Sequence, residues 1–172
     1  SQSGFDIRHC EYDGGDSCDG HADETNSWIA IDPSKTSQVE GLQAGTVSVQ
    51  DSNSPTVSFD QSFSNTPLVF AQFQTHNGND DSLNIRVHSV STSDFTLDSC
   101  EQDGSDGCDS SHTSETAGWV AIDPNTFDGS GLFDTGTTSV SESSWNSVSF
   151  STSYSSNPAI DTMVQTESGG QE

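Results

Sequence analysis

The sequence has very few basic side chains. Only Arg8, Lys35 and Arg86 stand against 27 aspartates and glutamates, and the formal net charge is −24 at pH 7. A protein that binds nucleic acid needs a patch of cations to neutralise several phosphates. Anionic membrane surfaces likewise attract clusters of lysine and arginine. The composition therefore excludes nucleic acid and anionic lipid headgroups as partners.

Long apolar runs are also missing. Hydrophobic residues make up 28% of the 172 positions, and no stretch approaches the roughly 20 apolar residues of a membrane-spanning helix. The chain opens with Ser-Gln-Ser-Gly, without an initiator methionine or the apolar core of a signal peptide. We expect no membrane insertion in this segment, and a processed product or a piece of something longer.

Leu, Ile, Val and Phe are scarce, at about 18% of residues, a share typical of disorder when net charge is high. Alternating apolar stretches, cysteines in two pairs of equal spacing and an internal repeat nevertheless favour a folded protein. Its self-repulsion would be screened in brine, because the Debye length falls to about 3 Å at 1 M salt. We interpret the acidic excess as a halophile's surface; an ordinary acidic protein in ordinary salt is the alternative.

The chain repeats itself with a period of about 91 residues. Residues 21–33 return as residues 112–124, with eight of thirteen positions identical. Phe5 to Glu11 returns as Phe95 to Glu101, and Thr46 to Thr75 matches Thr137 to Thr166. Fixed-period similarity of this kind marks a repeated structural unit.

The repeat predicts three parts: 1–45 is the C-terminal half of a unit, 46–136 is a complete unit, and 137–172 is the N-terminal half of another. Residues 76–91 have no second copy. Three arrangements are open. The two halves close on each other within one chain, a neighbouring subunit completes each half, or the chain is cut from a longer array.

Alternation of apolar and polar residues predicts β-strands at 56–63, 68–73, 83–87 and 119–122. Turn-forming residues lie between these stretches, and no stretch of ten residues has helical spacing. The pattern predicts an all-β fold of tandem antiparallel β-sandwich units. Trp28 and Trp119, each among Ile, Val and Ala, are predicted core residues.

The four cysteines recur in pairs, Cys10 with Cys18 and Cys100 with Cys108, with seven residues inside each pair. This recurrence predicts two local disulfides, each stabilising by about 2–3 kcal/mol. Disulfides indicate a location outside the cytoplasm. Zinc is the alternative, although paired zinc-binding cysteines usually enclose two to four residues.

Three stretches of the sequence form a recognisable pattern. They are a strand that follows a proline at 65–70, a strand that contains an arginine and leads through Ser-Val-Ser to a Phe at 83–95, and a strand that contains a tryptophan at 119–122. The pattern resembles the H-type lectin domain of snail agglutinins and their microbial relatives. The resemblance implies a six-stranded antiparallel β-sandwich, often trimeric, that often binds galactose-type sugars. It makes Arg86 and His88 candidate ligand contacts, although Arg86 also matches a strand arginine that looks structural.

Carboxylates gather around the cysteines, where oxygen-rich, Gly-containing loops can hold Ca²⁺. The alternative is a solvated acidic turn. The candidate calcium ligands are Glu11, Asp13, Asp16, Asp19, Glu101, Asp103, Asp106 and Asp109.

The motif His-x-x-Glu occurs twice, as His21 with Glu24 and as His112 with Glu115. We interpret each as a structural pair that braces the loop before the Trp strand; a metal site or an acid–base pair is the alternative. Trp145 lies in a Ser-rich turn and is the predicted exposed contact residue.

No nucleophile elbow and no phosphate-binding loop is present, so we expect no enzyme. The first hypothesis is an extracellular structural or adhesive protein of a halophile, a filament subunit or virus spike segment, in which copies complete one another's strands. The alternative is a carbohydrate-binding adhesin that recognises surface glycans.

Overall fold

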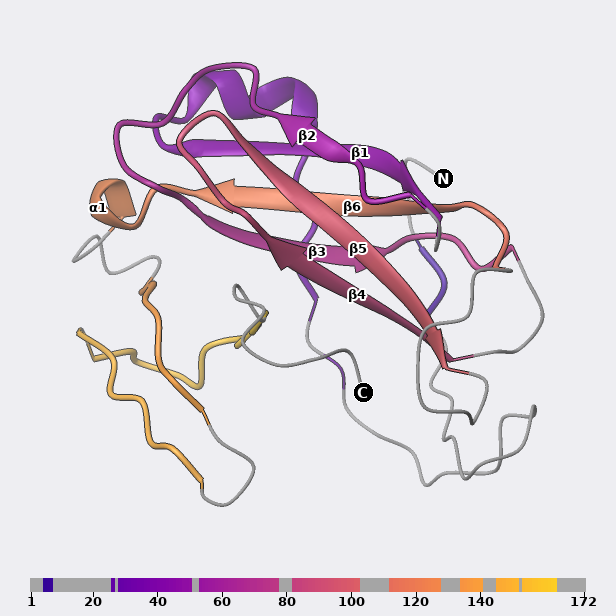
Figure 1. The fold of residues 1–172 in the computed structure, drawn as a ribbon. Helices are drawn as coiled ribbons and strands as arrows, with labels where there is room; N and C mark the ends of the chain where they lie inside the picture. The colour runs from indigo at the N-terminus through magenta and orange to yellow at the C-terminus, as the bar shows by residue number, and fades with distance from the viewer. Residues whose placement is uncertain are drawn as a thin grey trace.

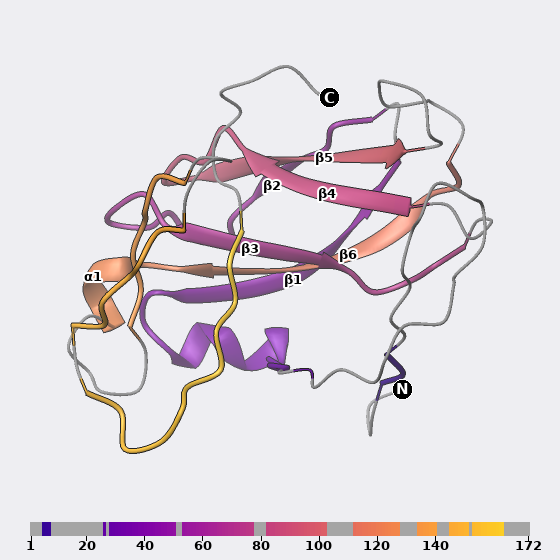
Figure 2. The same ribbon diagram turned by 90° about the horizontal axis from the view of Figure 1, so that it is seen from below.

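The computed structural model describes residues 5–7, 26, 28–50, 53–77, 82–102, 112–127, 134–140, 145–151 and 153–163. Its strands lie in two antiparallel sheets of three strands each, which stack as two layers (Figures 1 and 2). The all-β fold expected from the sequence is confirmed. Within the described residues the sandwich runs from Leu42 to Ile122.

The first sheet has the order β1-β6-β3. Strand β6 (Glu115–Ile122) lies between β1 (Leu42–Val49) and β3 (Leu68–Phe73) and pairs antiparallel with both. Alternate residues of β6 are buried, and the inward-facing positions include Trp119. The predicted Trp strand is therefore the central strand of its sheet.

The second sheet has the order β2-β5-β4. Strand β5 (Asp94–Gln102) lies between β2 (Thr56–Ser58) and β4 (Ser82–His88). The inner face of this sheet carries apolar residues such as Val87, Phe95 and Leu97, all fully buried. Polar side chains occupy the opposite face.

The two inner faces meet in an aromatic core. The Trp119 ring makes an edge contact with Phe95 at a centroid distance of 5.4 Å, and Phe59 lies 6.0 Å from Trp119. Apolar burial of this kind stabilises by about 25 cal/mol per Å². The core consists of Val49, Phe59, Phe63, Val69, Ala71, Val87, Phe95, Leu97, Ala117, Trp119 and Ala121.

The strand predicted at 56–63 ends at Ser58. Beyond it, the backbone N–H groups of Phe59 and Phe63 donate to the carbonyls of Ser93 and Thr92, in the loop before β5. Both rings stay in the core without a sheet ladder. The alternation in the sequence thus correctly predicted that Phe59 and Phe63 are buried, but it did not predict whether their backbone pairs with another strand.

Two short helices were not expected from the sequence: the 3₁₀ helix η1 (Pro33–Gln38) and α1 (Pro124–Phe127). Each follows an Asp-Pro pair of the repeat. Asp32 Oδ1 accepts a hydrogen bond from the Ser34 N–H at 3.0 Å, and Asp123 Oδ1 accepts one from the Asn125 N–H at 3.0 Å. An N-terminal Asp followed by Pro starts a helical turn without any 3.6-residue periodicity.

The segments before and after the sandwich do not show the half-units that the repeat predicted. Trp28, predicted as a core residue, is 66% exposed, whereas Trp119 is buried. None of the described residues of 5–32 and 134–163 lies in a strand, so the described residues supply no second sheet for Trp28 to pack against. The tandem arrangement of sandwich units stays a prediction.

Gly45 provides a test of this packing. A Cβ atom at Gly45 would lie 2.8 Å from Cζ2 of Trp119, whereas one at Gly136 would meet no atom within 4 Å. We expect Gly45→Ala to destabilise the protein by about 1–3 kcal/mol through overpacking, measured by urea unfolding. Ser48→Ala, at an exposed position on the outer face of the same strand, is the matched control and should change the unfolding free energy by less than about 0.5 kcal/mol. Equal effects of the two variants would contradict this packing.

Candidate functional site

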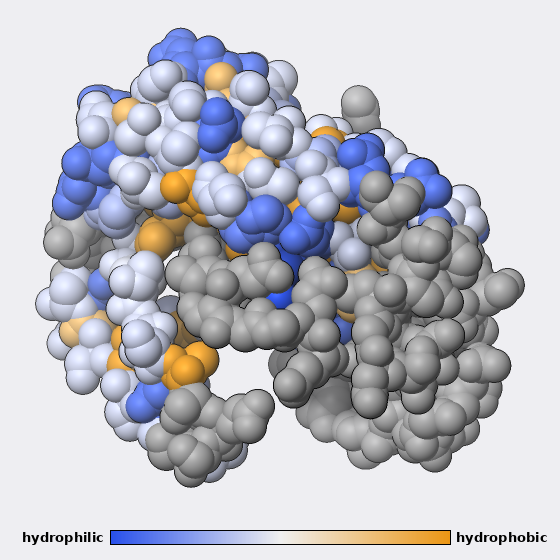
Figure 3. All heavy atoms as spheres, viewed as in Figure 1, coloured by the Kyte–Doolittle hydropathy of each residue, from blue (hydrophilic) through white to orange (hydrophobic). Residues whose placement is uncertain are grey.

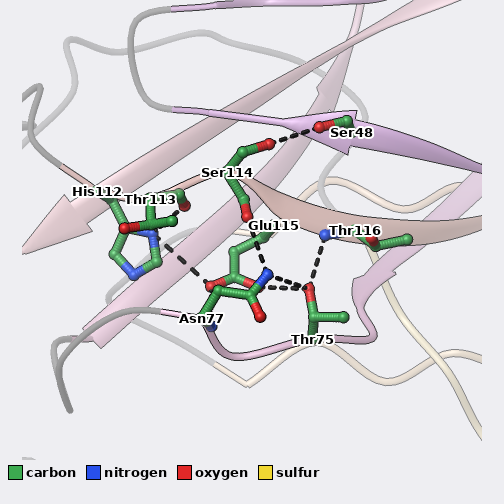
Figure 4. Close-up of polar contacts among 8 residues, drawn as sticks. All are labelled: Ser48, Thr75, Asn77, His112, Thr113, Ser114, Glu115 and Thr116. Atoms are coloured by element: carbon green, nitrogen blue, oxygen red, sulfur yellow. Dashed lines mark hydrogen bonds and ion pairs between the residues drawn. The ribbon is translucent and has the colours of Figure 1, made fainter.

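A group of polar residues lies at the end of the sandwich where β3 ends and β6 begins (Figure 4). We call it the Glu115 cluster. Its side chains come from segments about 40 positions apart in the sequence. The cluster consists of Thr75, Asn77, His112, Ser114, Glu115 and Thr116.

Glu115 is 2% exposed, so its carboxylate needs hydrogen-bond donors in place of water. Its Oε2 accepts from the Thr75 hydroxyl, and its Oε1 accepts from the backbone N–H of Asn77. Hydrogen bonds to an ionised acceptor are about twice as strong as neutral ones. The carboxylate therefore holds residues 75–77 onto the first residue of β6.

The same residues extend the pairing between β3 and β6. The N–H of Thr116 donates to Thr75 Oγ1 at 2.7 Å, and the N–H of Gln74 donates to the Thr116 carbonyl at 2.7 Å. The Asn77 side-chain amide donates to the Ser114 carbonyl at 3.0 Å. The segment after β3 is thus fixed by side chains where the ladder ends.

This arrangement leaves a polar surface on a fixed backbone. His76 and Asn77 are both exposed, and their neighbours Thr75 and Glu115 hold the backbone between them. The sequence singled out neither His76 nor Asn77. Their connection to Glu115 depends on the pairing of β3 with β6, which local periodicity does not reveal.

His112 is 4% exposed and lies at the entry to β6. Its Nδ1 is 2.7 Å from the Thr113 carbonyl and 3.9 Å from Glu115 Oε1. His112 and Glu115 thus lie together where the chain enters β6, and their bracing role stays a prediction. The other predicted pair, His21 and Glu24, lies outside the described residues.

The predicted ligand residues of the Arg strand lie elsewhere, on the outer face of the second sheet. His88 Nε2 is 2.8 Å from Asp98 Oδ2, and its Nδ1 is 3.0 Å from Ser89 Oγ. Arg86 is the register partner of Asp98 across β4 and β5. Asp98 was not predicted, because its place beside His88 follows only from that register.

Trp145 is fully exposed, as predicted, at 102%. It lies in the segment 145–151, outside the sandwich. The three predicted ligand residues therefore do not form one site: Arg86 and His88 lie on the second sheet, and Trp145 lies on the C-terminal segment. Whether any of them contacts a ligand stays a prediction.

The predicted calcium ligands are largely outside the described residues; only the backbone of Glu101, in β5, is described. Among the described residues, no three His, Cys, Asp or Glu side chains are grouped so that they could hold a metal ion. Cys100 is disulfide-bonded. Its predicted partner Cys108, like Cys10 and Cys18, lies outside the described part of the chain.

Residues 54–122 match the family model of the H-type lectin domain. The matched stretch contains β2 to β6, every residue of the aromatic core except Val49, and the Glu115 cluster. No curated protein and no solved structure matches the chain. The resemblance predicted from the sequence is therefore confirmed for this part of the chain.

In the described residues, no helix is long and apolar enough to cross a membrane.

The Glu115 cluster can be tested by unfolding. We expect Glu115→Ala and Thr75→Val each to destabilise by about 1–3 kcal/mol, because the first removes both acceptors that hold residues 75–77 and the second leaves an oxygen of the buried Glu115 carboxylate unpaired. The matched control is Ser48→Ala, which removes the exposed hydroxyl contact between Ser48 and Ser114 and should change stability by less than about 0.5 kcal/mol. Urea unfolding measures all three; a Glu115→Ala variant as stable as the control would refute the role of the carboxylate.

Proposed function

We propose, from the H-type lectin domain at residues 54–122, that this protein is a carbohydrate-binding β-sandwich without enzymatic activity. The family match is the observation that carries the proposal. H-type lectins are non-enzymatic carbohydrate-binding proteins, in agreement with the absence of catalytic motifs in the sequence. Of the two functions expected from the sequence, the match favours the glycan-binding adhesin over the purely structural role.

The proposed glycan contact is the end of the sandwich at the Glu115 cluster. Sugar hydroxyls both donate and accept hydrogen bonds, so a binding surface needs amide or imidazole groups held in fixed positions. His76 and Asn77 supply such groups from an exposed position. The bonds from Glu115 to Thr75 and Asn77 fix the backbone that carries them, which lowers the entropy lost on binding.

Charge narrows the class of glycan. A net charge of −24 opposes contact with sialylated, sulfated or otherwise anionic glycans, over a long range at low ionic strength and over about 3 Å in multimolar salt. Neutral sugars carry no such penalty and are recognised by hydrogen bonds and apolar contact. We therefore propose neutral glycans, with galactose-type sugars first because of the family resemblance.

Glycan binding tests the proposal. We expect wild-type protein on a glycan array in roughly 2 M NaCl to bind neutral, galactose-type glycans, and His76→Ala and Asn77→Ala each to weaken binding at least tenfold, about 1.4 kcal/mol. Arg86→Ala, His88→Ala and Trp145→Ala form the comparison set.

The outcomes separate the candidate sites. Loss of binding in Trp145→Ala alone would move the contact to the C-terminal segment, and loss in Arg86→Ala or His88→Ala alone would move it to the second sheet. Protein that stays folded by circular dichroism yet binds no glycan would refute the lectin function.

The predicted disulfides support a location outside the cell, and the acidic composition supports a halophilic microbe or its virus as the source. We expect the midpoint of thermal unfolding to rise between 0.15 M and roughly 2 M NaCl, because the Debye length falls from about 8 Å toward 3 Å and repulsion between carboxylates is screened. Differential scanning fluorimetry measures this midpoint. Sucrose is the control, since it strengthens apolar burial without screening charge; a midpoint that rises in sucrose but not in NaCl would refute salt adaptation.

A further inference from the structure

The segments on both sides of the sandwich carry aromatic pairs that repeat those of its core. We call residues 5–32 the N flank and residues 134–163 the C flank. In the core, Phe95 and Trp119 make an edge contact at 5.4 Å with an interplanar angle of 68°. In the N flank, Phe5 and Trp28 make the same contact at 5.6 Å and 70°. These two residues are the repeat counterparts of Phe95 and Trp119.

The C flank repeats the other half of the core. Phe59 and Phe63 contact each other at 4.8 Å and 84°. Their counterparts Phe150 and Tyr154 do so at 5.3 Å and 85°. Each flank thus already has the local ring geometry of half a sandwich core.

The contacts that join the two halves of the core have no buried equivalent. In the sandwich, Phe59 lies 5.5 Å from Phe95 and 6.0 Å from Trp119. The counterpart rings Phe150, Phe5 and Trp28 are 45%, 57% and 66% exposed. Each flank therefore shows the face that meets the other half in the complete unit.

A glycine makes the two flanks complementary. Gly45 of β1 lies opposite Trp119 of β6, and any side chain there would collide with the indole ring. The repeat contains a counterpart of each residue of this pair, but the two counterparts lie in different flanks: Gly136 is in the C flank and Trp28 is in the N flank. Open space surrounds the Cβ position of Gly136, so none of the described residues of the same chain fills the room that this glycine leaves.

Apart from Val39, the large exposed hydrophobic residues of the described chain lie in these two flanks. Every large exposed hydrophobic residue lies outside the sandwich strands, and hydrophobic residues reach the surface of the C flank at the lower left of Figure 3. Apolar patches of this kind mark interaction sites. The residues are Phe5, Ile7, Trp28, Ile29, Val39, Val140, Trp145, Val148, Phe150 and Ile160.

We propose that the N flank of one copy packs against the C flank of a second copy, so that two chains together build a second sandwich that lacks only the counterpart of β4, because residues 76–91 have no second copy. A second copy fits because it carries the missing half-core, including the indole ring that faces the glycine, while both faces stay exposed within a single chain. When two copies exchange flanks reciprocally, the assembly closes as a dimer; when each pairs with a different neighbour, it grows into a chain. This inference does not depend on glycan binding.

Complementation between two variants tests the proposal. Size-exclusion chromatography with light scattering in roughly 2 M NaCl should give wild-type protein at least twice the 18.2 kDa mass of one chain. Trp28→Arg blocks the N flank and Phe150→Arg blocks the C flank, so each variant alone should run as a monomer. An equimolar mixture should recover assemblies of twice the monomer mass, because each variant supplies the flank that the other lacks.

The control is Ser139→Arg, which adds the same charge in the C flank at the counterpart of Ser48, an outward-facing position of β1. It should assemble as the wild type does. Gly136→Val offers a second route that leaves the aromatic rings intact, and it should raise the protein concentration at half-assembly at least tenfold. A monomeric wild type, or two blocked variants that do not complement each other, would overturn the proposal, the first result pointing to closure of the flanks within one chain.

Discussion

The packing of Trp119 is the interaction on which the rest of the structure depends. Its strand, β6, pairs with β1 on one side and β3 on the other, so the first sheet exists only if β6 is in place. The indole then reaches across the layers to Phe95 of the second sheet. Because Gly45 leaves room for the ring, β1 can pair directly opposite it. One aromatic side chain thus sets the order of one sheet and its contact with the other.

The same strand connects the core to the candidate site. Glu115 and Trp119 both face inward on β6, four positions apart, and Glu115 is the first residue of the strand. Its carboxylate fixes residues 75–77 at the point where apolar packing ends. The position of His76 and Asn77 is therefore determined by the register of β6 against β3, and the position of β6 is in turn determined by the core.

The sequence allowed prediction of the parts whose signal is local. Strands β3, β4 and β6 were predicted, whereas β1, with Gly45 inside it, and β5, in which the buried Ser99 interrupts the alternation, were not. Asp98 beside His88 and Thr75 beside Glu115 were missed because each contact joins residues that only strand register brings together. Trp28 was expected in the core because it has the same local sequence as Trp119, but burial also requires a partner sheet, which local sequence does not encode.

Charge and exposed apolar surface constrain each other in this protein. At low ionic strength, a net charge of −24 keeps two copies apart, because repulsion acts over a Debye length of about 30 Å at 0.01 M. In multimolar salt that protection shrinks to about 3 Å, while the rings of Phe5, Trp28 and Phe150 stay as apolar as before. A salt-adapted chain that left these faces open would aggregate without specificity. The ring pairs of the two flanks already have the geometry of the core, and Gly136 leaves room for the indole of Trp28. These features direct each flank to one specific partner, the matching flank of a second copy, so the rings can stay exposed in high salt without nonspecific aggregation.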